Sequence, residues 1–237
     1  QIFFQKKRTV SNNLTIALSQ SASTDECEIH FGITSGSNFV LVSGSIKKGE
    51  FSHVMAMYDR YNDQRCKLLI NNIIHSSSQQ LLFDDLDYSA ADLRIGSGDT
   101  IRLGADLFTN IQTLSGSIDD LRYFHSVDPV AKIKKRKNRS YYPNSKDPSL
   151  KLYYRFNEPY GDYTGKNIVL DSSGNSLHER ILNFEDSNRL TGSDVPVLSE
   201  ELYRNPVLFP TYNSVSNLNT TLLTTASNYD DFNPNII

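Results

Sequence analysis

Gly116-Ser117-Ile118-Asp119-Asp120-Leu121-Arg122-Tyr123-Phe124 is the most informative segment of this chain, and two further segments belong with it. Upstream lies Gly49-Glu50-Phe51-Ser52-His53-Val54-Met55-Ala56-Met57-Tyr58-Asp59, followed by Cys66-Lys67-Leu68-Leu69-Ile70-Asn71-Asn72. Downstream lie Leu152-Tyr153-Tyr154-Arg155-Phe156-Asn157-Glu158 and Asp171-Ser172-Ser173-Gly174-Asn175. Strand-like alternation and turn-forming residues recur in these segments, which is typical of short β-strands joined by tight turns.

The rest of the first 125 residues has the same character. Alternation in 28–33 would place Ile29, Phe31 and Ile33 on one face of a strand, and Asn71-Asn72 can adopt the positive φ angles of a hairpin turn. Many short strands without long helical periods predict an all-β fold, an antiparallel β-sandwich. The expected strands are 1–5, 14–18, 28–33, 38–42, 53–58, 66–70, 73–75, 101–103, 118–124 and 151–156.

Composition narrows the class of protein. The chain has 237 residues, 38% of them hydrophobic, and a formal net charge of −3, so no global positive field predicts nucleic-acid binding. The longest apolar runs are far shorter than the roughly 20 residues that span a bilayer, so we expect no membrane insertion. Because the chain opens in a strand-like run, we expect it to be a piece of a longer polypeptide. Two cysteines are too few for a disulfide framework, and Cys27 and Cys66 are expected to be unpaired thiols.

The first two segments resemble laminin-G-like domains of the concanavalin A-like lectin and glucanase superfamily. In that family a strand of the type W-x-H-V-x-x-x-Y-D precedes a hairpin ending in L-Y-V-N-G, and a later strand reads G-x-I-D-D-V-R-I-Y. Here Phe51 takes the place of the Trp, His53-Val54 and Tyr58-Asp59 match, and Gly116 to Tyr123 matches the later strand. The resemblance implies a jelly-roll sandwich.

The third segment departs from the family order. A pattern of the type L-x-Y-Y-x-F-N-E…D-S-S-G-N opens such a domain, whereas here it follows the other two, at 152–175. Two explanations remain: 150–185 begins a second domain, or it folds back and supplies the opening strand that the first sandwich lacks. We favour folding back, because a lone strand with unpaired edges is unstable.

Four regions are therefore expected. Residues 1–127 form the sandwich, 128–149 a short basic helix and linker, 150–185 the completing strand and loop, and 186–237 an irregular C-terminal extension. The basic run in 130–139 could contact an anionic partner, but a solvated helix with late basic residues is the preferred interpretation. The extension resembles segments of tailed-phage virion proteins that carry laminin-G-like modules, which implies other virion subunits as partners in an oligomeric assembly.

No enzyme signature accompanies these segments. Retaining glycosidases need two carboxyl groups about 5–5.5 Å apart, and the family pattern E-x-D-x-E is absent. Asp85 and Asp87 have suitable spacing but lie in a polar loop, and the histidines lack zinc-ligand spacing. We therefore expect no catalytic residues and no required cofactor.

Binding sites are the remaining candidates. Calcium prefers carboxylate, amide and carbonyl oxygens, so Asp171, Asn175, Asp119 and Asp120 are candidate ligands, although a turn held by Asx hydrogen bonds explains 171–175 equally simply. Sugar binding would use aromatic faces in loops, and the candidates are Tyr61, Tyr88, Tyr160 and Tyr163.

These observations favour a non-catalytic structural or adhesion module of a phage virion, acting through surface complementarity. The alternative is a carbohydrate-binding lectin module, calcium-assisted, on a secreted or surface protein. A glycosidase is the third and weakest interpretation.

Overall fold

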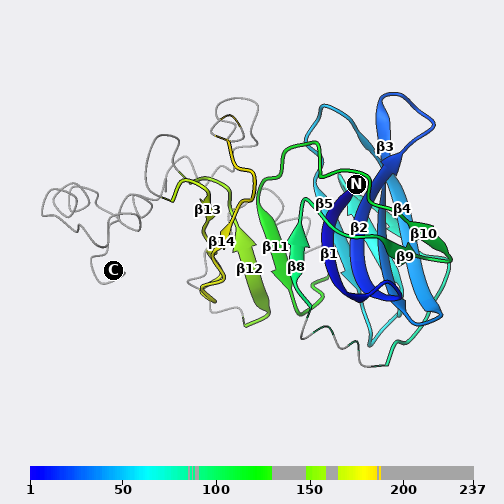
Figure 1. The fold of residues 1–237 in the computed structure, drawn as a ribbon. Helices are drawn as coiled ribbons and strands as arrows, with labels where there is room; N and C mark the ends of the chain where they lie inside the picture. The colour runs from blue at the N-terminus through cyan, green and yellow to red at the C-terminus, as the bar shows by residue number, and fades with distance from the viewer. Residues whose placement is uncertain are drawn as a thin grey trace, which may run out of the picture. The chain divides into compact units, whose positions relative to one another are not determined.

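The computed structural model describes residues 1–84, 86, 88, 91–129, 148–158, 165–185 and 187. These residues form an all-β structure with antiparallel strand pairing throughout, and no α-helix occurs among them. Contacts divide the chain into two compact units, Gln1–Ser117 and Ile118–Ile237, which are described separately (Figure 1).

The first unit contains a five-stranded sheet in the order β4-β3-β2-β1-β8, a three-stranded sheet in the order β5-β6-β7, and a β9–β10 hairpin. Neighbouring strands are mostly consecutive in sequence, which is the arrangement of a meander. The bounds of these strands are β1 Ile2–Thr9, β2 Asn12–Gln20, β3 Glu26–Ser35, β4 Asn38–Lys47, β5 Val54–Tyr58, β6 Cys66–Ile70, β7 Ile73–Ser76, β8 Leu93–Ile95, β9 Ile101–Leu103 and β10 Asp106–Phe108.

One face of the five-stranded sheet shares an apolar core with the three-stranded sheet. The alternation predicted for 28–33 is confirmed, because Ile29, Phe31 and Ile33 all lie in this core. Leu68 of β6 packs against them and is fully buried, with 0% exposure. The further members of the core are Val40, Val42, Cys66, Ile70 and Phe83. The two sheets are therefore held together mainly by apolar burial.

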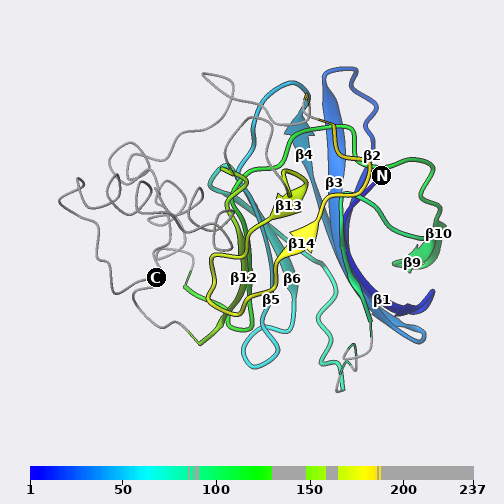
Figure 2. The ribbon, with the colours of Figure 1, turned by 60° about the vertical axis from the view of Figure 1, so that its left-hand side comes forward.

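The opposite face of the five-stranded sheet is covered in part by the β9–β10 hairpin. Ile101 and Leu103 of the hairpin form a second apolar cluster with Ile2 and Ala17. A side chain at Gly32 would place its Cβ 2.8 Å from Leu103 Cδ1, so glycine permits this close approach. In Figure 2 the hairpin lies on one side of strands β1 to β4, and β5 and β6 lie on the other.

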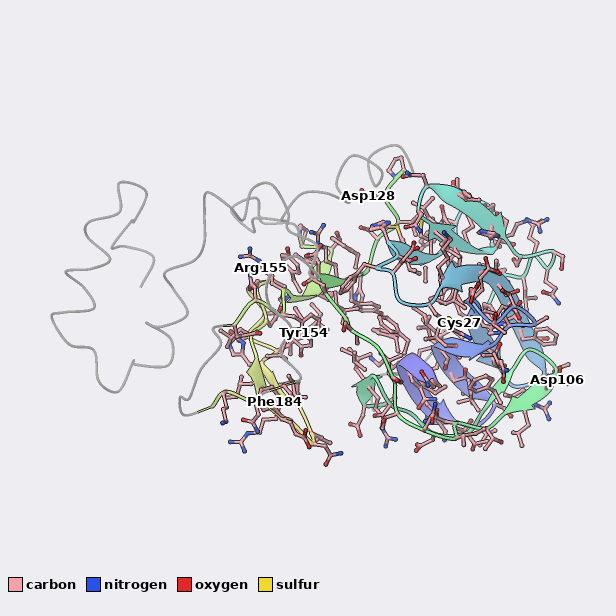
Figure 3. The ribbon with its side chains drawn as sticks, turned by 90° about the horizontal axis from the view of Figure 1, so that it is seen from above. Cys27, Asp106, Asp128, Tyr154, Arg155 and Phe184 are labelled. Atoms are coloured by element: carbon pink, nitrogen blue, oxygen red, sulfur yellow. The ribbon has the colours of Figure 1, made fainter. Side chains whose placement is uncertain are left out.

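The second unit contains two small antiparallel pairs. Strand β11 (Leu121–Phe124) pairs with β12 (Leu150–Tyr154), and β13 (Ile168–Val169) pairs with β14 (Glu179–Arg180). An isolated bridge joins Tyr154, labelled in Figure 3, to Asp171. The third sequence segment therefore pairs with the strand of the Gly116–Phe124 segment. That residues 150–185 complete the first sandwich stays a prediction.

The expected strands are found with shifted ends. Strand β11 begins at Leu121 rather than at 118, because Asp120 adopts a positive φ of 53°, and β12 ends before Phe156, whose φ is 56°. The predicted turn is confirmed, since Asn71 and Asn72 have φ angles of 46° and 85°. Strands β8, β10, β13 and β14 are not among the expected strands; two or three residues give a weak periodic signal, although the equally short β9 is among them.

The remaining expectations concern the cysteines, membrane insertion and the regions after residue 127. Cys27 and Cys66 are free thiols. No helix in the described part of the chain is long and apolar enough to cross a membrane. The basic helix expected in 130–138 and, apart from Ser187, the extension expected over 186–237 lie outside the described residues. The expected division at 127, 149 and 185 stays a prediction.

Candidate functional site

The carboxylate of Asp171, the first calcium candidate, is already engaged by four donors. Its Oδ1 accepts hydrogen bonds from the backbone N–H groups of Tyr153 (3.0 Å) and Ser173 (2.9 Å). Its Oδ2 accepts from Ser173 Oγ (2.8 Å) and from the backbone N–H of Leu177 (3.0 Å). A calcium ion at this carboxylate would have to displace these donors. The contacts therefore favour a turn held by hydrogen bonds.

Asn175 belongs to the same turn. Its Nδ2 donates to the carbonyl oxygens of Leu150 (3.0 Å) and Lys151 (3.1 Å), which ties the turn to strand β12. The backbone N–H of Asp171 donates to His178 Nδ1 at 2.9 Å. The side chains of Asp171 and Asn175 thus hold a loop against its neighbouring strand, which explains why these residue types stand here.

Asp120, another of the calcium candidates, is engaged by a cation. Arg122 Nη2 lies 2.5 Å from Asp120 Oδ2, and the guanidinium carbon lies 4.9 Å from the centre of the Tyr153 ring. Arg122 and Tyr153 are directly paired across β11 and β12, so strand register creates this contact. Asp119 is half-buried beside this cluster in sequence. Among the described residues, no group of three or more His, Cys, Asp or Glu side chains is placed to hold a metal ion.

The candidate sugar-binding tyrosines have different surroundings. Tyr61, in the turn between β5 and β6, is 90% exposed. Tyr88 instead directs its hydroxyl to the carbonyl oxygen of Thr34 at 3.4 Å, and burial raises the pKa of its phenol. Tyr160 and Tyr163 lie outside the described residues, as do the carboxylates Asp85 and Asp87.

Polar residues of the His53–Asp59 and Cys66–Asn72 segments hold loops. The backbone N–H of His53 donates to Asn71 Oδ1 (2.9 Å), which fixes the β6–β7 turn to the start of β5. Asp59 Oδ1 accepts from the backbone N–H groups of Tyr61 and Asn62. Hydrogen bonding to Asn62, the largest contribution, lowers the pKa of Asp59 below its ordinary value. Asn71 and Asp59 thus stabilise turns at the two ends of β5.

Tyr58 of the same motif anchors the long segment that follows β7. Its hydroxyl donates to the carbonyl oxygen of Leu81 at 2.8 Å, and its ring meets that of Phe83 edge-on at 5.6 Å. Arg65 Nη1 donates to the carbonyl oxygens of Ser77 and Ser78. These contacts fasten a segment without regular strands to the apolar core.

A Ser–His–Glu cluster lies on the hairpin side of the five-stranded sheet. Ser19 Oγ lies 2.8 Å from His30 Nε2, and Glu28 Oε2 lies 3.7 Å from the same nitrogen. In a catalytic triad the acid orients the other ring nitrogen, Nδ1, so this geometry does not activate the serine. Burial lowers the pKa of His30, and the nearby Glu28 offsets this only in part.

A polar hollow at the β1–β8 edge is the candidate that sequence reasoning missed. It has a volume of about 160 Å³ and is lined by Gln5, Lys7, Arg8, Ala91, Asp92, Arg94 and Asp99. Asp99 forms two ion pairs in this hollow. Arg94 Nη1 lies 2.8 Å from Asp99 Oδ1, and Lys7 Nζ lies 3.5 Å from Asp99 Oδ2. The basic run Lys6-Lys7-Arg8 was the one available sequence signal, but its partners lie about 90 residues away.

Comparisons with protein-family models, curated proteins and solved structures returned no significant match. The laminin-G-like resemblance therefore depends on the motif residues themselves.

Proposed function

We propose that this chain is a non-catalytic structural and adhesion module built on a concanavalin A-like jelly-roll sandwich. The first unit supports a two-sheet antiparallel sandwich, because its two sheets share one apolar core through β3, β4 and β6, and the jelly-roll connectivity is part of the proposal. The order and spacing of the His53–Asp59 and Gly116–Tyr123 motifs point in the same direction.

One observation carries the non-catalytic part of the proposal. The polar side chains of the motif segments make hydrogen bonds and ion pairs that hold turns and strands: Asp59, Asp120 and Asp171 are the clearest cases. Carboxylates engaged in this way are poorly suited to general acid or base catalysis, which needs a proton-transfer group facing a substrate. The module then acts through the shape and chemistry of its surface.

We place the module in the virion of a tailed phage. The proposal is that residues 186–237 dock on neighbouring virion subunits while the sandwich loops face outward. The support is the sequence likeness of residues 205–235 to extensions of such proteins, together with the absence of an enzyme signature.

Purified virions whose genome encodes the chain provide the test. Antibodies raised against the purified chain should label intact particles at a regular position, and mass spectrometry should find the chain at a fixed ratio to the major capsid protein. Limited proteolysis adds a second readout: cleavage within 200–237 is expected in the free chain and suppressed in the particle. Absence of the chain from purified particles would exclude the virion assignment.

The alternative function is a carbohydrate-binding lectin module. The exposed Tyr61 favours it, since an exposed aromatic face beside polar groups suits a sugar ring. A glycan array probed with and without a calcium chelator tests this alternative. Chelator-sensitive binding would establish the calcium-assisted lectin, whereas the four hydrogen bonds to Asp171 lead us to expect binding, if present, to be unaffected by the chelator.

A further inference from the structure

We propose that the hollow at the β1–β8 edge binds a single acidic sugar residue, a pyranose ring that carries a carboxylate. The cations of the hollow would bind the carboxylate, and Asp99 and its neighbours would bind ring hydroxyls. This proposal deepens the adhesion role proposed above, because it names the chemistry of a ligand. The ligand is tested on the purified chain, so a negative result there does not bear on the virion assignment. Absence of the chain from virions likewise does not bear on sugar binding.

The size of the hollow sets the size of the ligand. The hollow has a volume of about 160 Å³. Pockets for drug-sized molecules are larger, at about 300–1,000 Å³. The hollow therefore suits one monosaccharide unit at the end or side of a glycan.

The charge of the hollow favours an anion. Three cationic side chains, Lys7, Arg8 and Arg94, line it against two carboxylates, Asp92 and Asp99. This local excess of one positive charge contrasts with the net charge of −3 of the whole chain. A negatively charged group is therefore attracted to this part of the surface, with an energy that salt will screen.

Two hydrogen bonds with Gln5 tie down the backbone at Asp99, next to the hollow. Gln5, which is 1% exposed, donates from Nε2 to the carbonyl oxygen of Asp99 (3.0 Å) and accepts from its backbone N–H at Oε1 (3.0 Å). A Cβ at Gly98 would lie 2.9 Å from Gln5 Oε1, so glycine leaves room for this pair of hydrogen bonds. Such fixed positions reduce the entropy cost of ordering the site on binding.

The side chains supply both acceptors and donors within one hollow. Slight burial acts to raise the pKa of Asp99, but hydrogen bonds and charges from Arg94 and Lys7 outweigh it and lower that pKa. Asp99 is thus an acceptor-only carboxylate next to ammonium and guanidinium donors. Neighbouring sugar hydroxyls each donate and accept, so several of them together match this alternation, whereas hydrogen phosphate offers fewer O–H donors. This difference favours an acidic sugar over phosphate.

Nuclear magnetic resonance titration of the ¹⁵N-labelled full chain tests the proposal with three probes: D-glucuronate, D-glucose and inorganic phosphate. With glucuronate we expect saturable shifts of the Gln5 side-chain amide and of the Gly98 and Asp99 backbone amides. Without aromatic stacking in the hollow, we expect a dissociation constant of about 1 mM, equivalent to about −4 kcal/mol. Glucose and phosphate should each bind at least about tenfold more weakly.

Variants assign the binding to the hollow. Arg94→Gln and Lys7→Gln should each weaken glucuronate binding about tenfold, while the matched control Lys47→Gln, which removes an exposed cation on β4, should leave it unchanged. Asp99→Asn should weaken glucuronate but strengthen phosphate binding, because it removes a negative charge and keeps the Gln5 backbone contacts. Chemical-shift dispersion verifies that each variant is folded.

Three results would overturn the proposal. The first is the absence of glucuronate-induced shifts at Gln5, Gly98 and Asp99. The second is equal binding of phosphate and glucuronate, which would make the hollow a simple anion site. The third is unchanged glucuronate affinity in both folded cation variants.

Discussion

The two faces of the five-stranded sheet are built in different ways. One face carries Ile29, Phe31 and Ile33 and packs on the second sheet mainly through apolar contacts. The other face buries polar side chains as well, and these reach across the sequence for partners. Gln5 bonds to Asp99, and Asn13 Nδ2 donates to the carbonyl oxygen of Arg102 at 3.1 Å. Thr34 Oγ1 also donates to the carbonyl oxygen of Arg102, at 3.1 Å.

The two faces therefore depend on different interactions for their stability: apolar burial on one, and apolar burial together with paired polar groups on the other. Apolar burial is non-directional and tolerates small shifts of the partner. Buried polar groups must meet specific donors and acceptors, because an unpaired group costs about 1–3 kcal/mol. The polar face is therefore the one on which the β9–β10 hairpin and the segment around Asp99 are positioned, and it is the face that carries the proposed ligand site.

The largest effect is expected in the apolar core. Leu68→Ala, at a side chain with 0% exposure, should lower the free energy of unfolding by about 2–5 kcal/mol, because it leaves a cavity between the sheets. Urea denaturation measures the change. The matched control Leu107→Ala, at a side chain that is 64% exposed on the hairpin, should stay within about 0.5 kcal/mol of the wild type. Similar small losses in both variants would contradict the shared core.

A smaller effect is expected on the polar face. Gln5→Ala leaves the backbone N–H and carbonyl of Asp99 without their partner, so the free energy of unfolding should fall by about 1–3 kcal/mol. The control Gln20→Ala removes the same side chain at an exposed position of β2 and should be nearly neutral. If the two variants were equally stable, polar pairing would not be what holds this face.

At the rim of the apolar core, Tyr58→Phe removes the hydroxyl bond to Leu81 but keeps the ring beside Phe83. The free energy of unfolding should fall by about 0.5–1.5 kcal/mol. Hydrogen exchange should quicken at the backbone amides of Leu81 and Phe83. Tyr61→Phe, at a side chain that is almost fully exposed, is the control and should change neither quantity. Unaltered exchange in Tyr58→Phe would mean that the hydroxyl does not anchor this segment.

The smallest effect concerns the pH dependence of stability through His30. Burial lowers the pKa of His30 in the folded chain below its ordinary value of 6.5. As the pH falls through about 6.5, the unfolded chain therefore takes up the proton first, and stability declines until folded His30 is also protonated. His30→Gln, which keeps a polar partner for Ser19, should show a shallower decline between pH 7 and pH 5 in urea titrations. If the free energy of unfolding declined equally steeply in the wild type and in His30→Gln, His30 would not contribute to the pH dependence of stability.

Sequence reasoning worked where local pattern and burial agree. The strand at 28–33, the hairpin turn at Asn71-Asn72 and the Asx-held turn at Asp171 all follow from residues within a few positions of one another. It failed for Gln5, whose burial is invisible to a hydrophobic pattern, and for the hollow, whose members come from β1 and from the region of β8. The proposed sugar-binding tyrosines were chosen by residue type, which does not separate the exposed Tyr61 from the engaged Tyr88.

The amino-acid sequence alone established an all-β antiparallel chain, the apolar side of its central strands and the tight turns between them. Alternation and turn propensity are local properties, and they are present in the unfolded chain as much as in the folded one. Tertiary structure decided which polar side chains are buried and which charges gather at the β1–β8 edge. Those outcomes depend on hydrogen-bond partners up to 94 residues away, which become neighbours only when the sheet has formed.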